Sequence, residues 1–209
     1  MLRIIIAALC FAYSTLSIAD NSIYVSAKVG KALPAESYTE THLGAVEFNF
    51  DNGDDYSLSF GKNINRYSLE FEYSKRSLSA NSRITISGNT TDKLNGKQIQ
   101  EEAFINAYYY PLLKHTYSLY YGIGLGLTVI KWSNVESAVF AGSIDSVDYV
   151  HSYKAMLGAS IKLTDNIDFL TSYEYLIIDH INLLASDGSP GKMNNQDIQK
   201  ISIGIKYNF

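Results

Sequence analysis

The chain has 209 residues, with 17 Lys and Arg against 21 Asp and Glu, which gives a formal net charge of −4. Its single cysteine lies in the N-terminal segment and no later run of 18 apolar residues exists, so a disulfide scaffold and a helical membrane protein are both excluded. Three prolines, 14 glycines and 17 tyrosines are typical of a β-rich composition, and the length suits one domain.

The N-terminus has the pattern of a secretory signal peptide. Met1–Arg3 is a short basic start, residues 4–18 are largely apolar, and Ala19 ends a stretch of small residues. The apolar run is shorter than the roughly 20 residues of a spanning helix, which disfavours the alternative of a membrane anchor. We therefore predict that residues 1–19 are cleaved and that residues 20–209 form one domain.

Alternating polarity begins directly after this segment. The first predicted strand covers residues 22–33, where apolar residues alternate with polar or small ones. Residues 34–53 are predicted to form a long loop, whose acidic charge disfavours nucleic acid as a partner. A turn signal within residues 46–60 leaves open an extra hairpin in this loop. The second strand is predicted at residues 55–62.

The alternation is sharpest at residues 66–75, the third predicted strand. Tyr67 and Phe71 face one side, whereas Glu70 and Glu72 face the other. In a soluble sandwich the charged face meets water, but in a membrane barrel it fills the interior. This strand therefore indicates a polar inside and an apolar outside.

The fifth predicted strand, residues 117–129, follows a fourth at residues 99–110 and is the longest alternating run. Its odd positions are all large and apolar, and its even positions are mostly Ser, Gly or Thr. Such a run exceeds an ordinary strand of about 5–6 residues and suits a tilted strand crossing a bilayer, which needs about 9–11. Its glycines lack the flanking helix of a phosphate loop. We expect them to leave room for inward neighbours such as Tyr120 or Phe104.

The connections between predicted strands alternate between long and short. The remaining strands are predicted at residues 148–163, 167–177 and 200–209, and the other long loops at residues 77–97, 133–147 and 179–196. Long loops on one side and short turns on the other are typical of outer-membrane barrels. We predict an all-β fold, an eight-stranded antiparallel up-and-down transmembrane β-barrel. The last strand must pair with the first, because an unpaired backbone edge in hydrocarbon costs several kcal/mol per group.

The inward charges of this barrel are predicted to form a structural ion network, since eight strands enclose a space that side chains just fill. An ion path, or a catalytic carboxylate pair at Glu70 and Glu72, is the functional alternative. The predicted network consists of Lys28, Arg66, Glu70, Glu72, Glu102, Lys154, Lys162, Asp168, Glu174, Lys200 and Lys206.

The histidines are scattered over the predicted loops, turns and strand ends, at positions 42, 115, 151 and 180. Metal sites need clustered ligands, so we predict no metal and no cofactor. His180-Ile-Asn182 is similar to the His-x-Ser of outer-membrane lipid A deacylases, but Asn182 stands where that motif has serine. We therefore predict no catalytic residues, with a lipid enzyme using His180 or His151 as an alternative.

Four segments resemble the small outer-membrane β-barrel surface proteins, namely the opacity-protein and major-surface-antigen group together with OmpX and the OmpA transmembrane domain. They are Arg66–Tyr73, Ile105–Tyr110, Tyr120–Gly126 and Ile203–Phe209. The last is similar to the C-terminal signal read by the outer-membrane insertion machinery. Its outward residues are Ile203, Ile205, Tyr207 and Phe209.

This resemblance implies a multi-pass protein of the bacterial outer membrane whose long loops are extracellular. It implies contacts with outer-membrane lipid, lipopolysaccharide and the insertion machinery, and binding of host-surface proteins through the loops. The leading hypothesis is therefore a non-enzymatic surface protein that acts in adhesion or envelope structure. A lipid-modifying enzyme and a narrow channel for small solutes are the alternatives.

Overall fold

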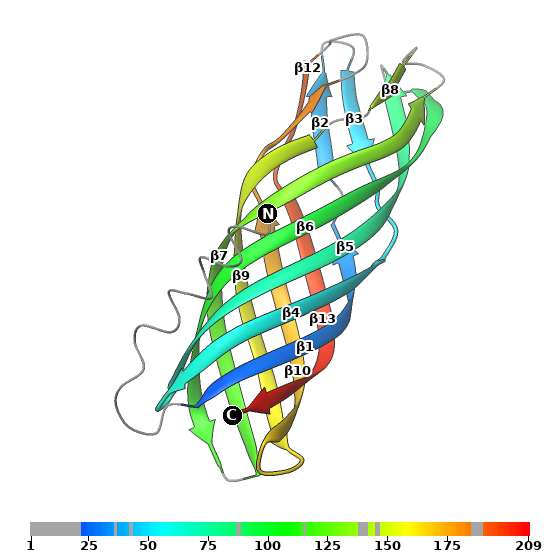
Figure 1. The fold of residues 1–209 in the computed structure, drawn as a ribbon. Helices are drawn as coiled ribbons and strands as arrows, with labels where there is room; N and C mark the ends of the chain where they lie inside the picture. Colours follow the sequence, from blue (N-terminus) through cyan, green and yellow to red (C-terminus); the bar gives the residue numbers. More distant parts are fainter. Residues whose placement is uncertain are drawn as a thin grey trace.

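The structure is a computed structural model that describes residues 22–35, 37–41, 44–86, 89–114, 116–137, 142–144, 147–184 and 190–209. The predicted signal peptide, residues 1–19, lies outside these ranges. Every regular element in the described ranges is a strand (Figure 1). In this part of the chain, no helix has the length and apolar character needed to cross a membrane.

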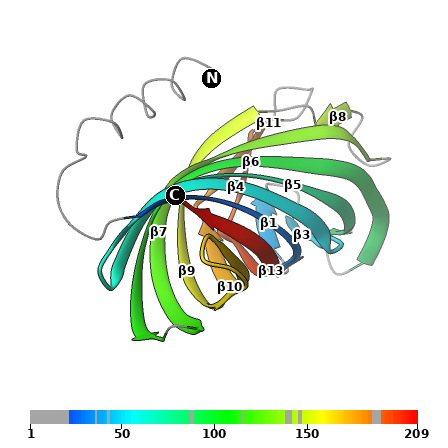
Figure 2. The ribbon, with the colours of Figure 1, turned by 60° about the horizontal axis from the view of Figure 1, so that its bottom comes forward.

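Eight long strands close into one antiparallel barrel, which confirms the predicted fold class. Each strand pairs with its neighbours in chain order, and β1 pairs with β13 to close the ring (Figures 1 and 2). The strands are β1 (Ile23–Pro34), β4 (Gly53–Ile64), β5 (Tyr67–Ile86), β6 (Asn89–Leu113), β7 (Tyr117–Ser137), β9 (Val147–Lys162), β10 (Ile167–Ile178) and β13 (Gln196–Asn208).

The two faces of these strands have the predicted chemistry over most of the barrel's length. On β5, Tyr67 and Leu69 are 60% and 54% exposed on the outside, whereas Glu70 and Glu72 are buried inside. In such a barrel the charged side chains are buried and the apolar side chains are exposed, whereas a soluble protein has the opposite distribution. The arrangement is stable only where hydrocarbon replaces water outside.

Short turns join the strands at the end where both described termini lie. Asn65 and Arg66 form the turn between β4 and β5, and Asn65 has a φ of 56°, which Asn tolerates better than most residues. Arg66 is exposed in this turn. The prediction that Arg66 points into the barrel is therefore wrong, because β5 begins one residue later than the alternation of polarity indicates.

At the opposite end, several strands run farther than their sequence predicts. The sequence predicts loops at residues 77–97 and 133–147, but residues 77–86, 89–97 and 133–137 belong to the long strands β5, β6 and β7. Ser79 pairs with Lys97, and the β5–β6 ladder continues to Ile86 and Asn89 with one irregularity at Ile84–Thr85. Ser-, Thr- and Asn-rich composition signals a loop only when no neighbouring strand supplies a backbone ladder.

Five short strands complete this end of the molecule. They are β2 (Ser37–Thr41), β3 (Gly44–Phe48), β8 (Gly142–Ile144), β11 (Ile181–Leu184) and β12 (Pro190–Met193). The extra hairpin left open at residues 46–60 is formed instead by β2 and β3, and the end of that range belongs to β4. The loop predicted at residues 179–196 likewise contains the β11–β12 hairpin.

These short strands continue the barrel in the same neighbour order. The sequence order makes β2, β3, β11 and β12 direct continuations of β1, β4, β10 and β13, and they pair in the order β11-β12-β2-β3-β5. Backbone hydrogen bonds cross the interruptions, from Ala35 N to Asp197 O at 2.9 Å and from Asp179 N to His151 O at 3.0 Å. We call the five short strands, with residues 77–86, 89–97 and 131–137, the extension, and the remaining barrel the wall.

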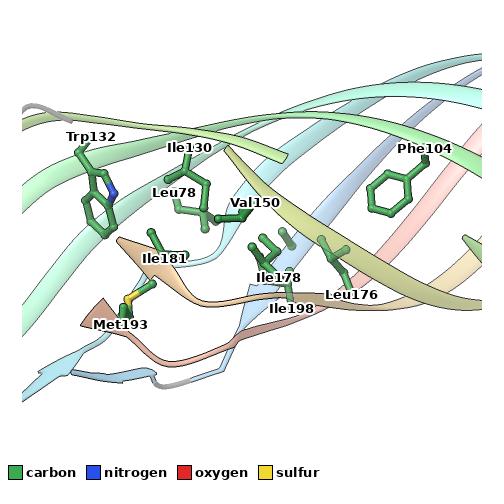
Figure 3. Packing of buried hydrophobic residues seen from close by; sticks show 11 residues of the cluster. Leu78, Phe104, Ile130, Trp132, Val150, Leu176, Ile178, Ile181, Met193 and Ile198 are labelled. Carbon is green, nitrogen blue, oxygen red and sulfur yellow. The ribbon is translucent and has the colours of Figure 1, made fainter. Parts of the chain in front are cut away.

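The described inward side chains of the extension are apolar. Leu78, Ile181 and Met193 are fully buried and Trp132 is 1% exposed, and all belong to one cluster that continues into the wall through Ile130 and Phe104. Figure 3 shows these side chains pointing toward a common interior from strands on several sides. The extension thus shares a continuous apolar core with the adjoining part of the wall.

Candidate functional site

The centre of the wall holds a buried network of charged side chains. Glu72 accepts hydrogen bonds from Lys28 Nζ and Lys154 Nζ, each at 2.9 Å. Glu174 lies 3.2 Å from Lys28 Nζ and 3.1 Å from Lys200 Nζ. All five side chains are at most 6% exposed, so the pairs are shielded from water. The structure thus brings five of the predicted network residues together.

A second branch of the network includes two residues that the sequence prediction missed. Arg76 lies 3.1 Å from Asp55 Oδ2 and 2.8 Å from Glu102 Oε1, and Lys200 Nζ lies 3.0 Å from Asp55 Oδ1. Asp55 and Arg76 are 1% exposed. Arg76 was missed because the predicted strand ended at Lys75, although even-numbered positions of β5 continue to face inward.

Glu70 is held differently from the other carboxylates. It accepts hydrogen bonds from Tyr24 at 3.0 Å, Tyr108 at 2.9 Å and Asn106 at 3.1 Å. Three neutral donors thus satisfy a carboxylate that is 5% exposed. Glu70 and Glu72 lie on one face as predicted, and both accept several buried hydrogen bonds, with Asn106 also donating to Glu72 at 3.2 Å. Such an arrangement stabilises a closed interior and leaves neither oxygen pair free for a substrate.

Aromatic side chains pack on the side of this network that is nearer the short turns. Tyr120 packs against Tyr108 with ring centroids 5.4 Å apart and against Tyr110 at 5.7 Å. The glycines of β7 accommodate large neighbours, because a Cβ on Gly126 would lie 2.5 Å from the Ala103 carbonyl and 2.6 Å from Phe104. The expected role of these glycines therefore holds for Phe104, whereas Tyr120 packs over Gly158 of β9.

On the other side, a layer of glutamines separates the charges from the apolar interior. Gln100 Nε2 donates to Gln98 Oε1 and Gln196 Oε1, both at 2.8 Å, and Gln100 Oε1 accepts from Arg76 at 3.1 Å. All three glutamines are fully buried. The guanidinium of Arg76 is therefore hydrogen-bonded to a glutamine amide on this side and does not end against aliphatic side chains.

The remaining predicted network residues lie at the short-turn mouth of the barrel, around a cavity of about 430 Å³. Lys206 pairs with Asp168 at 3.3 Å, and Lys162 pairs with Asp165 in the following turn at 3.1 Å. Asn208 also donates to Asp168, at 3.1 Å. Asp168, Lys162 and Lys206 are therefore separate from the central network. Each lies within a few residues of the end of its strand, on the short-turn side of the barrel.

The two described histidines lie on the outer surface near β11. His151 is exposed on β9, and His180 Nδ1 lies 2.6 Å from Asp179 Oδ1. The hydrogen bonds from His180 hold the pKa of Asp179 below its ordinary value. Asn182, in the position compared with the serine of lipid A deacylases, donates its backbone N–H to Asp148 at 2.6 Å. Within the described residues, no group of His, Cys, Asp and Glu is arranged to hold a metal ion.

The residues of the predicted C-terminal assembly signal line the outside of β13. Ile203, Ile205, Tyr207 and Phe209 are 51%, 45%, 42% and 71% exposed, respectively. Phe209 donates its backbone N–H to Ile23 O at 2.9 Å, so the last residue is still attached to the first strand. These side chains face the surroundings of the wall and are available to lipid.

Comparison with known proteins agrees with this geometry. The sequence matches the family described as "Outer membrane protein beta-barrel domain" over residues 4–209. No curated protein matches it.

Several solved barrels have the same fold. OprG from Pseudomonas aeruginosa superposes with a TM-score of 0.67 at 15% identity, covering 90% of this chain and 96% of that chain. Neisserial surface protein A gives 0.57 at 19% identity, covering 91% and 100%, respectively. The outer membrane protease OmpT from Escherichia coli gives 0.51 at 10%, covering 94% and 99%. At these identities, the likeness concerns the fold alone.

The family match extends over nearly the whole chain, and the wall turns apolar side chains outward along its strands. Such an exterior is stable in contact with the hydrocarbon of a lipid bilayer. In barrels of this class, the end with short turns faces the periplasm. The chain therefore belongs to the outer membrane protein β-barrel domain family and is an integral protein of the bacterial outer membrane.

Proposed function

We propose that this protein is a non-enzymatic surface protein that uses its extension to bind a host or partner surface. The observation that carries the proposal is that the strands continue beyond the wall and enclose an apolar core. A folded core holds the residues of the extension in place, so binding side chains lose little conformational freedom when a partner docks.

The filled interior supports this role over that of a channel. The charges of the central network are buried and mutually paired, and tyrosines on one side and glutamines on the other close the space above and below them. A conducting path needs a continuous polar route, and opening one here would have to displace side chains that are buried and paired across the interior.

The histidine region gives little support to the alternative of a lipid-modifying enzyme. Among the described contacts of His180, the partner is the neighbouring Asp179 carboxylate, and the side chain at position 182 is an amide. Nucleophilic catalysis needs a hydroxyl or thiol within hydrogen-bond reach of the base. An adhesive role needs only exposed and ordered surface.

Shortening the extension tests the proposal. In the trimmed variant, a two-residue turn replaces residues 81–95 of the β5–β6 hairpin and so retains the Ser79–Lys97 pair. Bacteria that display either form would be compared for adhesion to cultured epithelial cells and for retention of serum proteins. The boiled and unboiled proteins would be compared by electrophoresis to establish that the wall is folded.

We expect the trimmed variant to fold and to lose adhesion. Unchanged adhesion by a folded trimmed variant would refute the proposal. In parallel, discrete conductance of the full chain in planar bilayers would favour the channel, and a mass change in lipopolysaccharide or phospholipid incubated with it would favour the enzyme.

A further inference from the structure

The outer surface changes from apolar to polar at the same level on the neighbouring long strands β5 and β7. On β5 the outward residues pass from Phe71 and Tyr73 to Lys75 and Ser77, and on β7 from Leu127 and Val129 to Lys131 and Ser133. Because the wall contacts hydrocarbon and the extension contacts water, this change marks the level of the outer membrane surface.

Lysines gather at this level on one side of the barrel. Lys75 and Lys131 approach the same carboxylate, with Nζ atoms 3.5 Å and 3.0 Å from the two oxygens of Glu101. Their side chains are 57% and 42% exposed, whereas that of Glu101 is 12% exposed. Lys97, which faces outward on β6 near Lys131, is also exposed. We call Lys75, Lys97 and Lys131 the lysine arc.

The rest of the barrel circumference does not show this excess of positive charge at the described positions. Lys31 of β1 pairs one to one with Asp54 of β4 at 2.6 Å. On β13 the outward residues are Asp197 and Gln199, which accept hydrogen bonds from tyrosines of β10 at 2.6 Å and 3.0 Å. Among the described outward positions at this level, the excess positive charge therefore lies on the β5–β7 side, where two of the three lysines share one carboxylate.

We propose that the lysine arc binds the phosphate groups of a phosphorylated glycolipid in the outer leaflet. Each ammonium has three donors, and Glu101 occupies only one donor of Lys75 and one of Lys131. Directly toward the membrane lie Tyr73 and Val129, which can contact acyl chains. A molecule with phosphates above and acyl chains below matches both parts of this surface, whereas a soluble acidic partner matches only the lysines.

The test uses the folded full-length mature barrel in a zwitterionic detergent. Binding of bisphosphorylated lipid A and of the same lipid without phosphates would be measured by native mass spectrometry and by titration. The variants are Lys75→Ala, Lys131→Ala, their combination, and the charge-conserving Lys75→Arg with Lys131→Arg. Lys31→Ala is the matched control, since Lys31 lies at the same level with its own acidic partner.

We expect each arc substitution to weaken binding of bisphosphorylated lipid A by about fivefold, as each basic residue near an anionic lipid surface contributes about that factor. The double alanine variant should lose about 25-fold, whereas Lys31→Ala and the arginine variant should bind like the unmodified protein. Equal binding by the double variant, or by lipid A without phosphates, would overturn the proposal. Displacement of lipid A by an equal concentration of inorganic phosphate would assign the arc to free phosphate and overturn the lipid assignment.

Discussion

The wall and the extension are parts of one barrel with opposite polarity. In the wall, Glu72 and Lys154 are buried inside while Ile123 is 66% exposed outside. In the extension, Leu78 is fully buried and Trp132 is 1% exposed, while Lys97 faces outward. The strands pass from one part to the other without reversing which positions face inward.

This difference shows that backbone geometry and the surrounding medium determine separate properties of the barrel. Over the described side chains of β5, the inward positions are the even-numbered residues, from Glu70 through Arg76 to Leu78. Strand geometry sets that period of two, but the surrounding medium decides which chemistry suits each face. Where hydrocarbon gives way to water outside, apolar residues move to the inside, because only there can they be removed from water.

Removing a charge from the wall interior should have the largest effect. Glu72→Gln leaves Lys28 and Lys154 without a main carboxylate partner, and we expect it to lower the free energy of unfolding by about 3–5 kcal/mol. Urea unfolding in phospholipid vesicles, followed by the electrophoretic mobility of unboiled protein, measures this. Glu101→Gln on the outer surface is the control, with an expected change of about 0–1 kcal/mol. Equal effects of both variants would show that the buried network is not structural.

Truncating the core of the extension should be the next largest perturbation. Leu78→Ala creates a cavity in a fully buried apolar cluster and should lower the free energy of unfolding by about 2–5 kcal/mol. The fluorescence of Trp132, the single tryptophan and a member of the same cluster, reports the loss directly. Ser79→Ala, on the outward face of the same strand, should change stability by at most about 0.5 kcal/mol. If Leu78→Ala were as silent, the extension would have no core that contributes to folding.

The outward faces should respond oppositely to a new charge. Ile123→Arg places a guanidinium against the hydrocarbon near the middle of the wall, and should cost about 2–4 kcal/mol in a bilayer. Ser133→Arg, on the outward face of the same strand within the extension, should change stability by no more than about 0.5 kcal/mol. Unfolding of both variants in vesicles gives the comparison. If both substitutions lowered the free energy of unfolding equally, the membrane surface would not lie at the level of Lys131.

The smallest expected effect tests how tightly the wall interior is packed. Gly126→Ala would bring its Cβ within 2.5 Å of the Ala103 carbonyl, so the strands must move apart. We expect a loss of about 1–3 kcal/mol. Ala155→Val adds volume on the lipid-facing side of β9 and should be tolerated, as measured by the same urea unfolding. A destabilising Ala155→Val with a neutral Gly126→Ala would contradict the assignment of inside and outside.

Much of the wall could be predicted from residues alone. The alternation around Glu70 and Glu72 indicated both the strand and its inward face, and the alternating connection lengths indicated eight strands. The error at Arg66 arose because a turn residue continued the alternating pattern. The pairing of Lys28 with Glu72, or of Arg76 with Asp55, was outside local reasoning, since it depends on the register and closure of strands far apart in sequence.

The sequence by itself determined the period of two, the side of each strand that faces lipid, and the closure of the wall, because these follow from local alternation and from the cost of an unpaired edge in hydrocarbon. Only the tertiary structure decided that residues 77–86 and 89–97 are strands, that the strands of this end enclose apolar side chains, and that lysines gather on the β5–β7 side. In the extension the surroundings are aqueous, so polar residues at outward positions resemble a loop. Whether such a segment forms a strand depends on the neighbours that supply its backbone hydrogen bonds and cover its inner face.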